Sequence, residues 1–179
     1  MQYYRSLIDF YHNLQIVMKD SSSILLDGRG DCRDATRNLI LGCVGRLYLI
    51  TQSLEAELYN HADIHEHLAT LATTNRNTDI RIIAHSTRVA ANQGHYLIHL
   101  AQKLPTYVQI RTTVTVADRN FRESWLIADD GAYLRLQHPE RFEGYYETDN
   151  KLECRAYHDR FIEMWEACDP DQNTRRLSL

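Results

Sequence analysis

Hydrophobic side chains recur at helical spacing in five segments of this chain. The first segment carries Tyr4, Leu7, Ile8, Tyr11, Leu14 and Met18 on one helical face. This spacing predicts an amphipathic helix within residues 1–23, which we expect to pack on the rest of the protein. The same spacing predicts helices through residues 35–44, 64–72, 97–104 and 154–168. Gly45 and Pro170 mark the ends of the first and the last of these four helices.

Short apolar runs between these helices predict strands at residues 46–51, 80–84 and 108–111. Strands that alternate with helices are joined by right-handed crossovers and form parallel sheets. Residues 125–128 and 132–136 flank Asp129-Asp130-Gly131, which predicts a hairpin whose turn is supplied by Asp-Gly. We therefore expect an α/β fold with a mixed, mostly parallel sheet that is flanked by helices.

Length and composition predict one domain. A chain of 179 residues can build one compact core and is short for two. We expect this domain to span residues 24–170 and a polar tail to span residues 171–179. The formal net charge of −4 makes general polyanion binding unfavourable. Because almost all basic residues are arginines, a local anion site would use guanidinium forks.

The sequence also bears on location and on the cysteines. No apolar run approaches the roughly 18 to 20 residues of a membrane span. The amino terminus lacks the pattern of a secretory signal, so we expect a cytoplasmic protein. Cys32, Cys43, Cys154 and Cys168 are dispersed and form no Cys-x-x-Cys pair. We expect four reduced, mostly buried thiols.

The order of the predicted elements resembles a known family. Strands 46–51, 80–84 and 108–111, a hairpin that opens at residue 122, and a last helix with Phe161 and Trp165 four residues apart resemble one repeat of the phospholipase D-like superfamily. The resemblance implies a strand motif, His-x-Lys-x4-Asp. In that motif the histidine attacks phosphorus and the lysine holds the phosphate oxygens. It also implies that two copies meet at a pseudo-twofold axis.

The positions of this chain that match the motif are Arg122, Ser124 and Asp129. None of the nine histidines is followed two residues later by lysine. An arginine cannot form the covalent phosphoenzyme, because this chemistry needs a nucleophile of suitable pKa and a partner acid. We therefore expect a half-site with no catalytic residue, no metal and no cofactor. Turn chemistry explains Asp129 equally well.

Residues 30–170 resemble more closely a bacterial domain family that is itself similar to a degenerate phospholipase D-like module. The matching residues are 53–55 with 58–59, 94–97 at the start of the helix that reaches Leu104, 126–129, and Phe161 with Trp165. Members of this family often follow a GNAT-type N-acetyltransferase domain. No such domain is present in this sequence, so the resemblance leaves open an association with a separate acetyltransferase.

Histidines at helical spacing are further candidates. His61 and His65 have the spacing of two metal ligands on one helix face. The glutamate placement of a zinc protease motif is absent, so we favour a solvated helix start. His95 and His99 repeat the spacing. Because His95 lies at a helix start, it could cap the helix, pack, or face the sheet edge where ligands gather in open α/β sheets.

A thiol and an imidazole also lie one helical turn apart. Cys154 and His158 could form a reactive pair, but Cys154 falls on the apolar stripe of its helix. We therefore interpret Cys154 as a core thiol.

Two functions are compatible with these observations. The first is a non-catalytic binding or protein-interaction module. Its sheet edge would bind a phosphate-containing ligand or a protein partner through Ser53, Glu55, His95, Arg122, Ser124 and Asp129. The alternative is a phosphodiesterase or nuclease whose site forms from His95 and Asp129 across a homodimer axis. A homodimer fits both functions, because a single repeat exposes the surface that two-repeat relatives bury.

Overall fold

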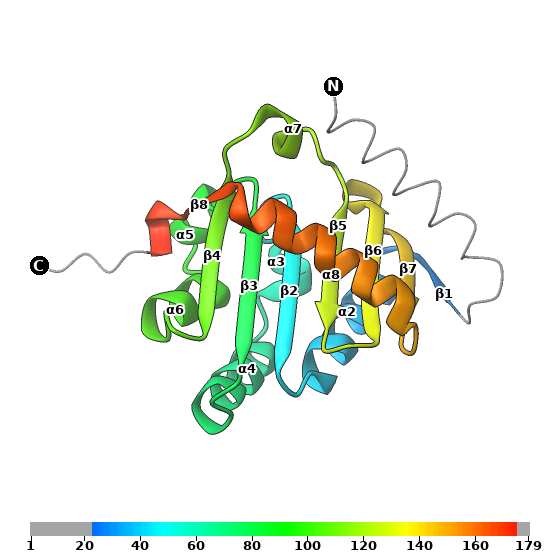
Figure 1. The fold of residues 1–179 in the computed structure, drawn as a ribbon, viewed down its shortest axis with the longest axis horizontal. Helices are drawn as coiled ribbons and strands as arrows, with labels where there is room; N and C mark the ends of the chain where they lie inside the picture. Colours follow the sequence, from blue (N-terminus) through cyan, green and yellow to red (C-terminus); the bar gives the residue numbers. More distant parts are fainter. Residues whose placement is uncertain (1–22, 175–179) are drawn as a thin grey trace, which may run out of the picture.

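The computed structural model describes residues 23–174 of the chain, which are built around an eight-stranded sheet (Figure 1). The strand order across the sheet is β1-β7-β6-β5-β2-β3-β4-β8. The strands are β1 (Ile24–Asp27), β2 (Arg46–Thr51), β3 (Asp79–Ala84), β4 (Val108–Thr113), β5 (Ser124–Ala128), β6 (Ala132–His138), β7 (Glu143–Glu147) and β8 (Cys168–Pro170). The predicted strands and the predicted hairpin are therefore confirmed.

The expectation of a mostly parallel sheet is wrong. Only the β2–β3 and β3–β4 pairs are parallel, and the other five neighbouring pairs are antiparallel. Three of the antiparallel pairs involve β1, β7 or β8, which the hydrophobic pattern does not predict. These strands have three to five residues. Runs this short carry little periodic signal, so partner strands decide whether they form.

The hairpin between β5 and β6 also differs in detail. Its loop has three residues, because Ala128 pairs with Ala132. The residue with left-handed backbone is Asp129, at φ 51°, whereas Gly131 is not among the residues with positive φ. Aspartate tolerates this conformation because its short side chain can hydrogen-bond locally. The turn therefore depends on Asp129 and not on the Asp-Gly pair.

Each helix predicted within residues 23–174 is present. The α-helices are α2 (Arg29–Gly42), α3 (Ala56–Tyr59), α4 (Ala62–Thr74), α5 (Arg88–Asn92), α6 (Tyr96–Lys103), α7 (Val116–Arg119) and α8 (Lys151–Glu166). Two single 3-10 turns are η1 (Pro139–Arg141) and η2 (Gln172–Thr174). The predicted ends differ, because α2 ends at Gly42, before Gly45, and α8 ends at Glu166, before the short strand β8.

Helices cover the two faces of the sheet unequally. Helices α2 to α6 pack on one face over a core that includes Leu47, Ile82 and Leu126. On the other face, α8 crosses the strands (Figure 1) and packs over a smaller core that includes Trp125 and Phe161. Successive strand residues point to opposite faces. This is why Trp125 and Leu126 belong to different cores, and why β5 reads as a continuous apolar run.

Gly144 permits a close approach of β7 to β6. It pairs with Leu136, beside a register shift between Leu136 and His138. A Cβ atom at Gly144 would lie 2.0 Å from the carbonyl oxygen of Arg135. Only glycine fits this position.

The ends of the chain are described in part. The predicted amino-terminal helix falls on residues 1–22, outside the described residues, and so do residues 175–179. Asp171, just after β8, is buried and accepts a hydrogen bond of 2.6 Å from the Thr87 hydroxyl. Among residues 23–174, no helix is both long and apolar enough to cross a membrane.

All four cysteines are free and buried, as predicted. Burial raises the pKa of the Cys32 and Cys154 thiols to about 11. Burial also raises the pKa of Cys43 and Cys168, to about 12. The thiols are therefore protonated at neutral pH, and a nucleophilic thiolate is not available at these positions.

Candidate functional site

A groove of about 750 Å³ lies at the carboxyl-terminal edge of β2. Three segments line it: residues 52, 53 and 55 after β2, Arg122 before β5, and residues 137–140 with Phe142 at the end of β6 and beyond it. The carboxyl ends of parallel strands are where ligands gather in open α/β sheets. The groove therefore brings together three of the predicted site residues, Ser53, Glu55 and Arg122.

The turn after β2 is fixed by the Glu55 side chain. Its carboxylate accepts hydrogen bonds from the Thr51 hydroxyl and, at 3.1 Å, from the Ser53 backbone N–H. The Ser53 hydroxyl lies 3.4 Å from the same carboxylate. Leu54 adopts left-handed backbone, at φ 59°, and its N–H donates to the Thr51 hydroxyl oxygen. Glu55 thus holds the turn, and Ser53 stays exposed at the groove.

The segment before β5 is held by side chains from the ends of β2 and β3. Gln52 donates from Nε2 to the carbonyls of Phe121 and Glu123, each at 3.3 Å. His85 lies 2.7 Å from the Phe121 carbonyl through Nε2 and 3.0 Å from the Thr113 hydroxyl through Nδ1. The chain leading to Arg122 is therefore fixed.

Sequence reasoning missed His85. Burial lowers its pKa, the nearby Arg122 guanidinium adds to this, and the hydrogen bond with the Phe121 carbonyl opposes it. A neutral ring fits the contacts, because Nε2 donates to the carbonyl and Nδ1 accepts from the Thr113 hydroxyl. The signal that could have found His85 is its place directly after the predicted strand 80–84.

Arg122 is exposed and forms no hydrogen bond or ion pair with any residue in the described part of the chain. Its neighbour Glu123 behaves differently. The Glu123 carboxylate receives the Arg135 guanidinium in a bidentate pair, at 2.7 and 2.8 Å, and also the Trp125 indole N–H at 2.8 Å. The two adjacent residues therefore differ in their contacts. Glu123 binds side chains of the core, whereas Arg122 lies at the groove without a partner in the described part of the chain.

Ser124 is buried, and its hydroxyl has no hydrogen-bond partner among residues 23–174. By alternation along β5 it shares a sheet face with Leu126, on the side of helices α2 to α6. Ser124 lies beside the groove in sequence but does not line it.

His95 caps helix α6 and does not line the groove. Its Nδ1 accepts a hydrogen bond of 3.2 Å from the Leu97 backbone N–H. Only 2% of His95 is exposed. Burial lowers the pKa of His95 to about 4, and His61 contributes in the same direction, whereas the Leu54 carbonyl opposes the shift. Of the three roles considered for His95, the geometry supports the cap.

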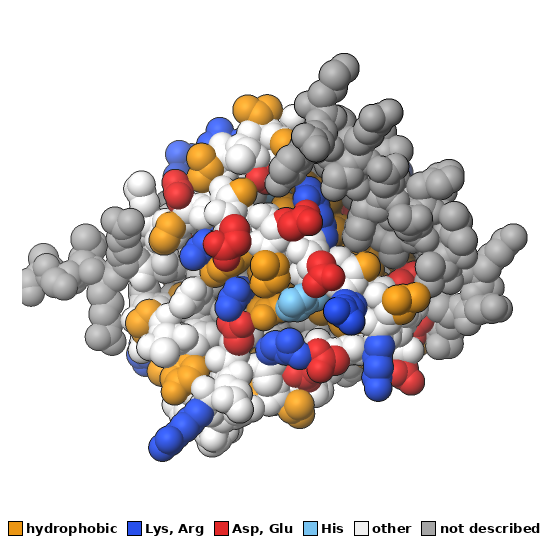
Figure 2. Space-filling view, in the orientation of Figure 1, with side chains coloured by type: hydrophobic (Ala, Val, Ile, Leu, Met, Phe, Trp, Pro, Cys, Tyr) orange, Lys and Arg blue, Asp and Glu red, His pale blue; other side chains and the backbone are white. Residues whose placement is uncertain are grey.

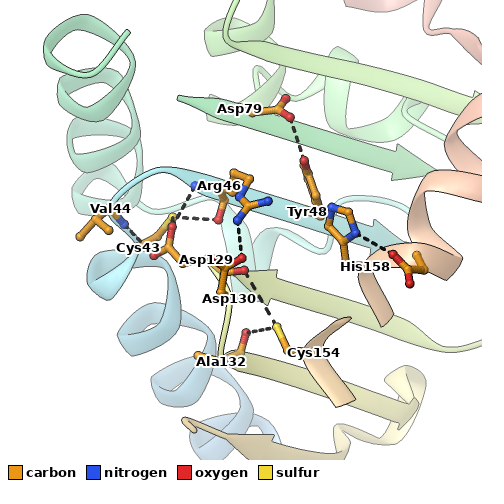
Figure 3. Close-up of polar contacts among 11 residues, drawn as sticks. Cys43, Val44, Arg46, Tyr48, Asp79, Asp129, Asp130, Ala132, Cys154 and His158 are labelled. Atoms are coloured by element: carbon orange, nitrogen blue, oxygen red, sulfur yellow. Dashed lines mark hydrogen bonds and ion pairs between the residues drawn. The ribbon is translucent and has the colours of Figure 1, made fainter. Parts of the chain in front are cut away.

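Asp129 follows β5 at the end opposite Arg122. It lies beside Cys43, Val44 and Arg46 (Figure 3). Its carboxylate accepts hydrogen bonds of 2.9 Å from the backbone N–H groups of Val44 and Arg46. The Cys43 thiol also points toward it, at 3.9 Å. Asp129 therefore closes the turn that connects α2 to β2, and the structure does not bring it together with Arg122.

The other predicted constellations lie elsewhere. His61 precedes α4 and its Nε2 is 2.9 Å from the Glu57 carbonyl, while the His65 ring stacks 5.9 Å from that of His99. Across residues 23–174, no three side chains of His, Cys, Asp or Glu group as a metal site would require. Cys154 points toward the Ala132 carbonyl at 3.8 Å. The geometry therefore supports the interpretation of Cys154 as a core thiol.

The groove also contains residues that the sequence did not single out. Gln137, His138 and Glu140 line it together with Ser53 and Arg122. His138 is exposed, and its Nδ1 lies 3.7 Å from the Glu140 carboxylate. These three residues reach Arg122 only because β6 pairs with β5. No local sequence pattern could therefore have identified them as part of the groove.

Several solved structures have a fold similar to that of this chain. TrmBL2, an archaeal chromatin protein whose structure shows a novel mode of DNA binding, matches 95% of this chain with a TM-score of 0.60 and 11% identity. This chain spans 63% of TrmBL2. Nuc from Salmonella typhimurium, a phospholipase D family member, matches 87% of this chain and all of its own length, with a TM-score of 0.59 and 12% identity.

NucT from Helicobacter pylori matches 84% of this chain and 99% of its own length, with a TM-score of 0.55 and 16% identity. No curated protein matches the sequence. The fold is therefore phospholipase D-like, and identities this low show the fold alone. A family model, Domain of unknown function (DUF7931), matches residues 28–177. The chain belongs to the DUF7931 family.

Proposed function

We propose that this protein is a non-catalytic binding module that holds a phosphate-containing ligand in the groove beside Arg122. The observation that carries the proposal is the state of Arg122: its guanidinium is exposed at the groove and has no partner among residues 23–174. A guanidinium binds phosphate oxygens through two parallel N–H donors. Arg122 also occupies the position of the nucleophile in the motif that the sequence resembles.

The acidic residues of the groove are compatible with an anion there. The Glu55 carboxylate already accepts hydrogen bonds from Thr51 and Ser53, and Glu140 faces His138. Ser53 and Gln137 offer neutral donors at the same groove. The lining holds two carboxylates and one guanidinium, so the proposal rests on the missing partner of Arg122 and not on a net positive charge.

The proposal excludes the phosphoenzyme chemistry of the resembled motif. Arginine is protonated at all accessible pH values and has no lone pair for attack. No lysine lines the groove. A homodimer, a cytoplasmic location and an association with an acetyltransferase stay predictions that accompany this proposal.

Thermal denaturation tests the proposal. The purified protein is heated with inorganic phosphate, nucleotides, short DNA and RNA, and phospholipid head groups, because a ligand of the native state raises the midpoint by mass action. We expect at least one of these to raise it, and Arg122→Ala to abolish the shift. Arg76→Ala, which removes an exposed arginine of the loop before β3, is the matched control and should keep the shift. The proposal is contradicted if no ligand of the panel gives a shift that depends on Arg122.

A phosphodiesterase is the second candidate, and His138 favours it. This exposed histidine lies in the groove with Arg122 and has Glu140 beside it, so an imidazole and a carboxylate are available for acid–base work. Hydrolysis of a chromogenic phosphodiester that His138→Ala abolishes would support this candidate. Hydrolysis that His138→Ala leaves unchanged, or no hydrolysis, would count against it.

A further inference from the structure

A second groove lies at the amino-terminal edge of β2, at the opposite end of β5 from Arg122. It encloses about 380 Å³. One wall comes from the start of β2 and the β5–β6 turn, through Arg46, Asp129 and Asp130. The other wall comes from the first turns of α8, through Lys151, Arg155 and His158. Figure 3 shows Arg46 between Asp130 and Tyr48, with His158 on the α8 side.

The three acidic residues of this second groove all have partners. Asp129 accepts two backbone N–H groups of the α2–β2 turn, both at 2.9 Å. Asp130 is paired with the Arg46 guanidinium. The Asp159 carboxylate lies 3.3 Å from Nδ1 of His158. None of these three carboxylates forms an ion pair with Lys151 or Arg155 of the other wall.

Two basic residues of α8 are left over. Lys151 and Arg155 are exposed, and neither forms an ion pair with a residue in the 23–174 span. They are four residues apart and so lie on the same helix face, one turn from each other. In the surface view, acidic and basic side chains alternate where α8 crosses the sheet, with a histidine among them (Figure 2). The groove holds three basic and three acidic side chains, so its formal charges balance, and the two cations without an ion-pair partner lie on one wall.

The remaining lining contains a thiol and an imidazole. Cys154 is buried in the lining, and burial raises the pKa of its thiol to about 11, so it adds no negative charge. The His158 ring packs on Tyr48 with ring centroids 5.3 Å apart. The Tyr48 hydroxyl donates to Asp79 at 2.8 Å, which fixes that ring. A flat, half-exposed imidazole thus borders the two free cations.

We infer that this second groove binds a small phosphate monoester, independently of the groove beside Arg122. A phosphate monoester carries about −1.5 to −2 charge at neutral pH, which matches two unpaired cations. Arg155 supplies a bidentate fork and Lys151 a point charge. A volume of about 380 Å³ lies within the range of small-molecule pockets. It leaves room for an organic group beside His158.

NMR titration of the full-length, ¹⁵N-labelled protein with phenyl phosphate tests the inference. We expect amide shifts to cluster at residues 46, 130, 151–155 and 158. The double variant Lys151→Gln/Arg155→Gln should bind at least about tenfold more weakly, because two charge-assisted contacts are lost. Arg122→Ala should leave this binding unchanged, which separates the two grooves.

Three controls make the test specific. Arg88→Gln/Lys103→Gln removes the same charge from two exposed residues elsewhere and should leave the affinity within about twofold. Phenyl sulfate, a monoanion of similar shape, should bind more weakly, and so should inorganic phosphate, which lacks the organic group. Absent shifts, equal weakening in both double variants, loss of binding with Arg122→Ala, or equal affinity for inorganic phosphate would overturn the inference.

Discussion

The two ends of β5 carry residues that one sequence motif joins, yet their environments are opposite. At the start of β5, Arg122 is exposed at a groove and the backbone beside it is held by Gln52 and His85. At its end, the Asp129 carboxylate binds backbone N–H groups. Since a strand rises about 3.3 Å per residue, Ser124 and Asp129 are separated by roughly 15 Å. The motif positions therefore cannot meet at one small ligand.

The two ends of β5 show two kinds of charged side chain, those with a partner inside the protein and those without one. A charged side chain that satisfies the protein's own backbone or a buried partner stabilises the fold, as Asp129 and Glu123 do. A charged side chain without a partner is available to a ligand, as we propose for Arg122 and the two cations of α8. This distinction depends on contacts and not on residue type, so the following substitutions test it.

The largest expected effect comes from two adjacent substitutions before β5. Glu123→Ala removes the bidentate partner of Arg135, whose side chain is 6% exposed, and the acceptor of the Trp125 indole. Breaking a buried ion pair costs about 3 kcal/mol or more. Arg122→Ala should change the free energy of unfolding by less than about 0.5 kcal/mol. Urea denaturation measures the free energy of unfolding of both variants. Equal losses would show that Glu123 does not stabilise the fold more than Arg122 does.

The next effect is a pH dependence at the start of α6. Because the pKa of His95 falls to about 4 in the folded protein, the unfolded chain binds its proton more readily below about pH 6.5. The neutral, buried His95 therefore contributes fully to the free energy of unfolding above pH 6.5. This contribution is lost as the pH falls toward 4, and the loss reaches about 3 kcal/mol. His95→Asn keeps a capping side chain and removes the titration.

The measurement is the urea midpoint from pH 7 to pH 4.5. The wild-type protein should lose more stability in acid than the His95→Asn variant. His85 and His65 also have lowered pKa values, so the variant should retain a smaller acid sensitivity. Parallel curves for the two proteins would refute the assignment to His95.

The smallest expected effect is at the far end of β5. Asp129→Ala removes two hydrogen bonds to a carboxylate and a side chain that tolerates left-handed backbone, so we expect a loss of about 2 kcal/mol. Asp159→Ala is the control, because its contact with His158 is exposed and should contribute less than about 0.5 kcal/mol. A loss for Asp129→Ala no greater than for the control would show that the turn does not depend on it.

Local sequence patterns predicted much of the architecture. Strands β2 to β6 and helices α2, α4, α6 and α8 follow from runs and spacings of apolar residues, because each of these elements buries its apolar side chains along its own length. The candidate residues Ser53, Glu55 and Arg122 also follow, since polar residues just outside apolar strands lie at a sheet edge. His85 could have been found by the same reasoning.

Only the tertiary structure decided the rest. Strands β1, β7 and β8 are too short for a periodic signal and form because a neighbouring strand offers hydrogen bonds. The left-handed residue of the hairpin is Asp129 because a carboxylate there meets the start of β2. The sequence by itself thus determined which segments are buried. The fold determined which charges find partners, because a hydrogen bond or an ion pair needs atoms from segments that the chain brings together only when it folds.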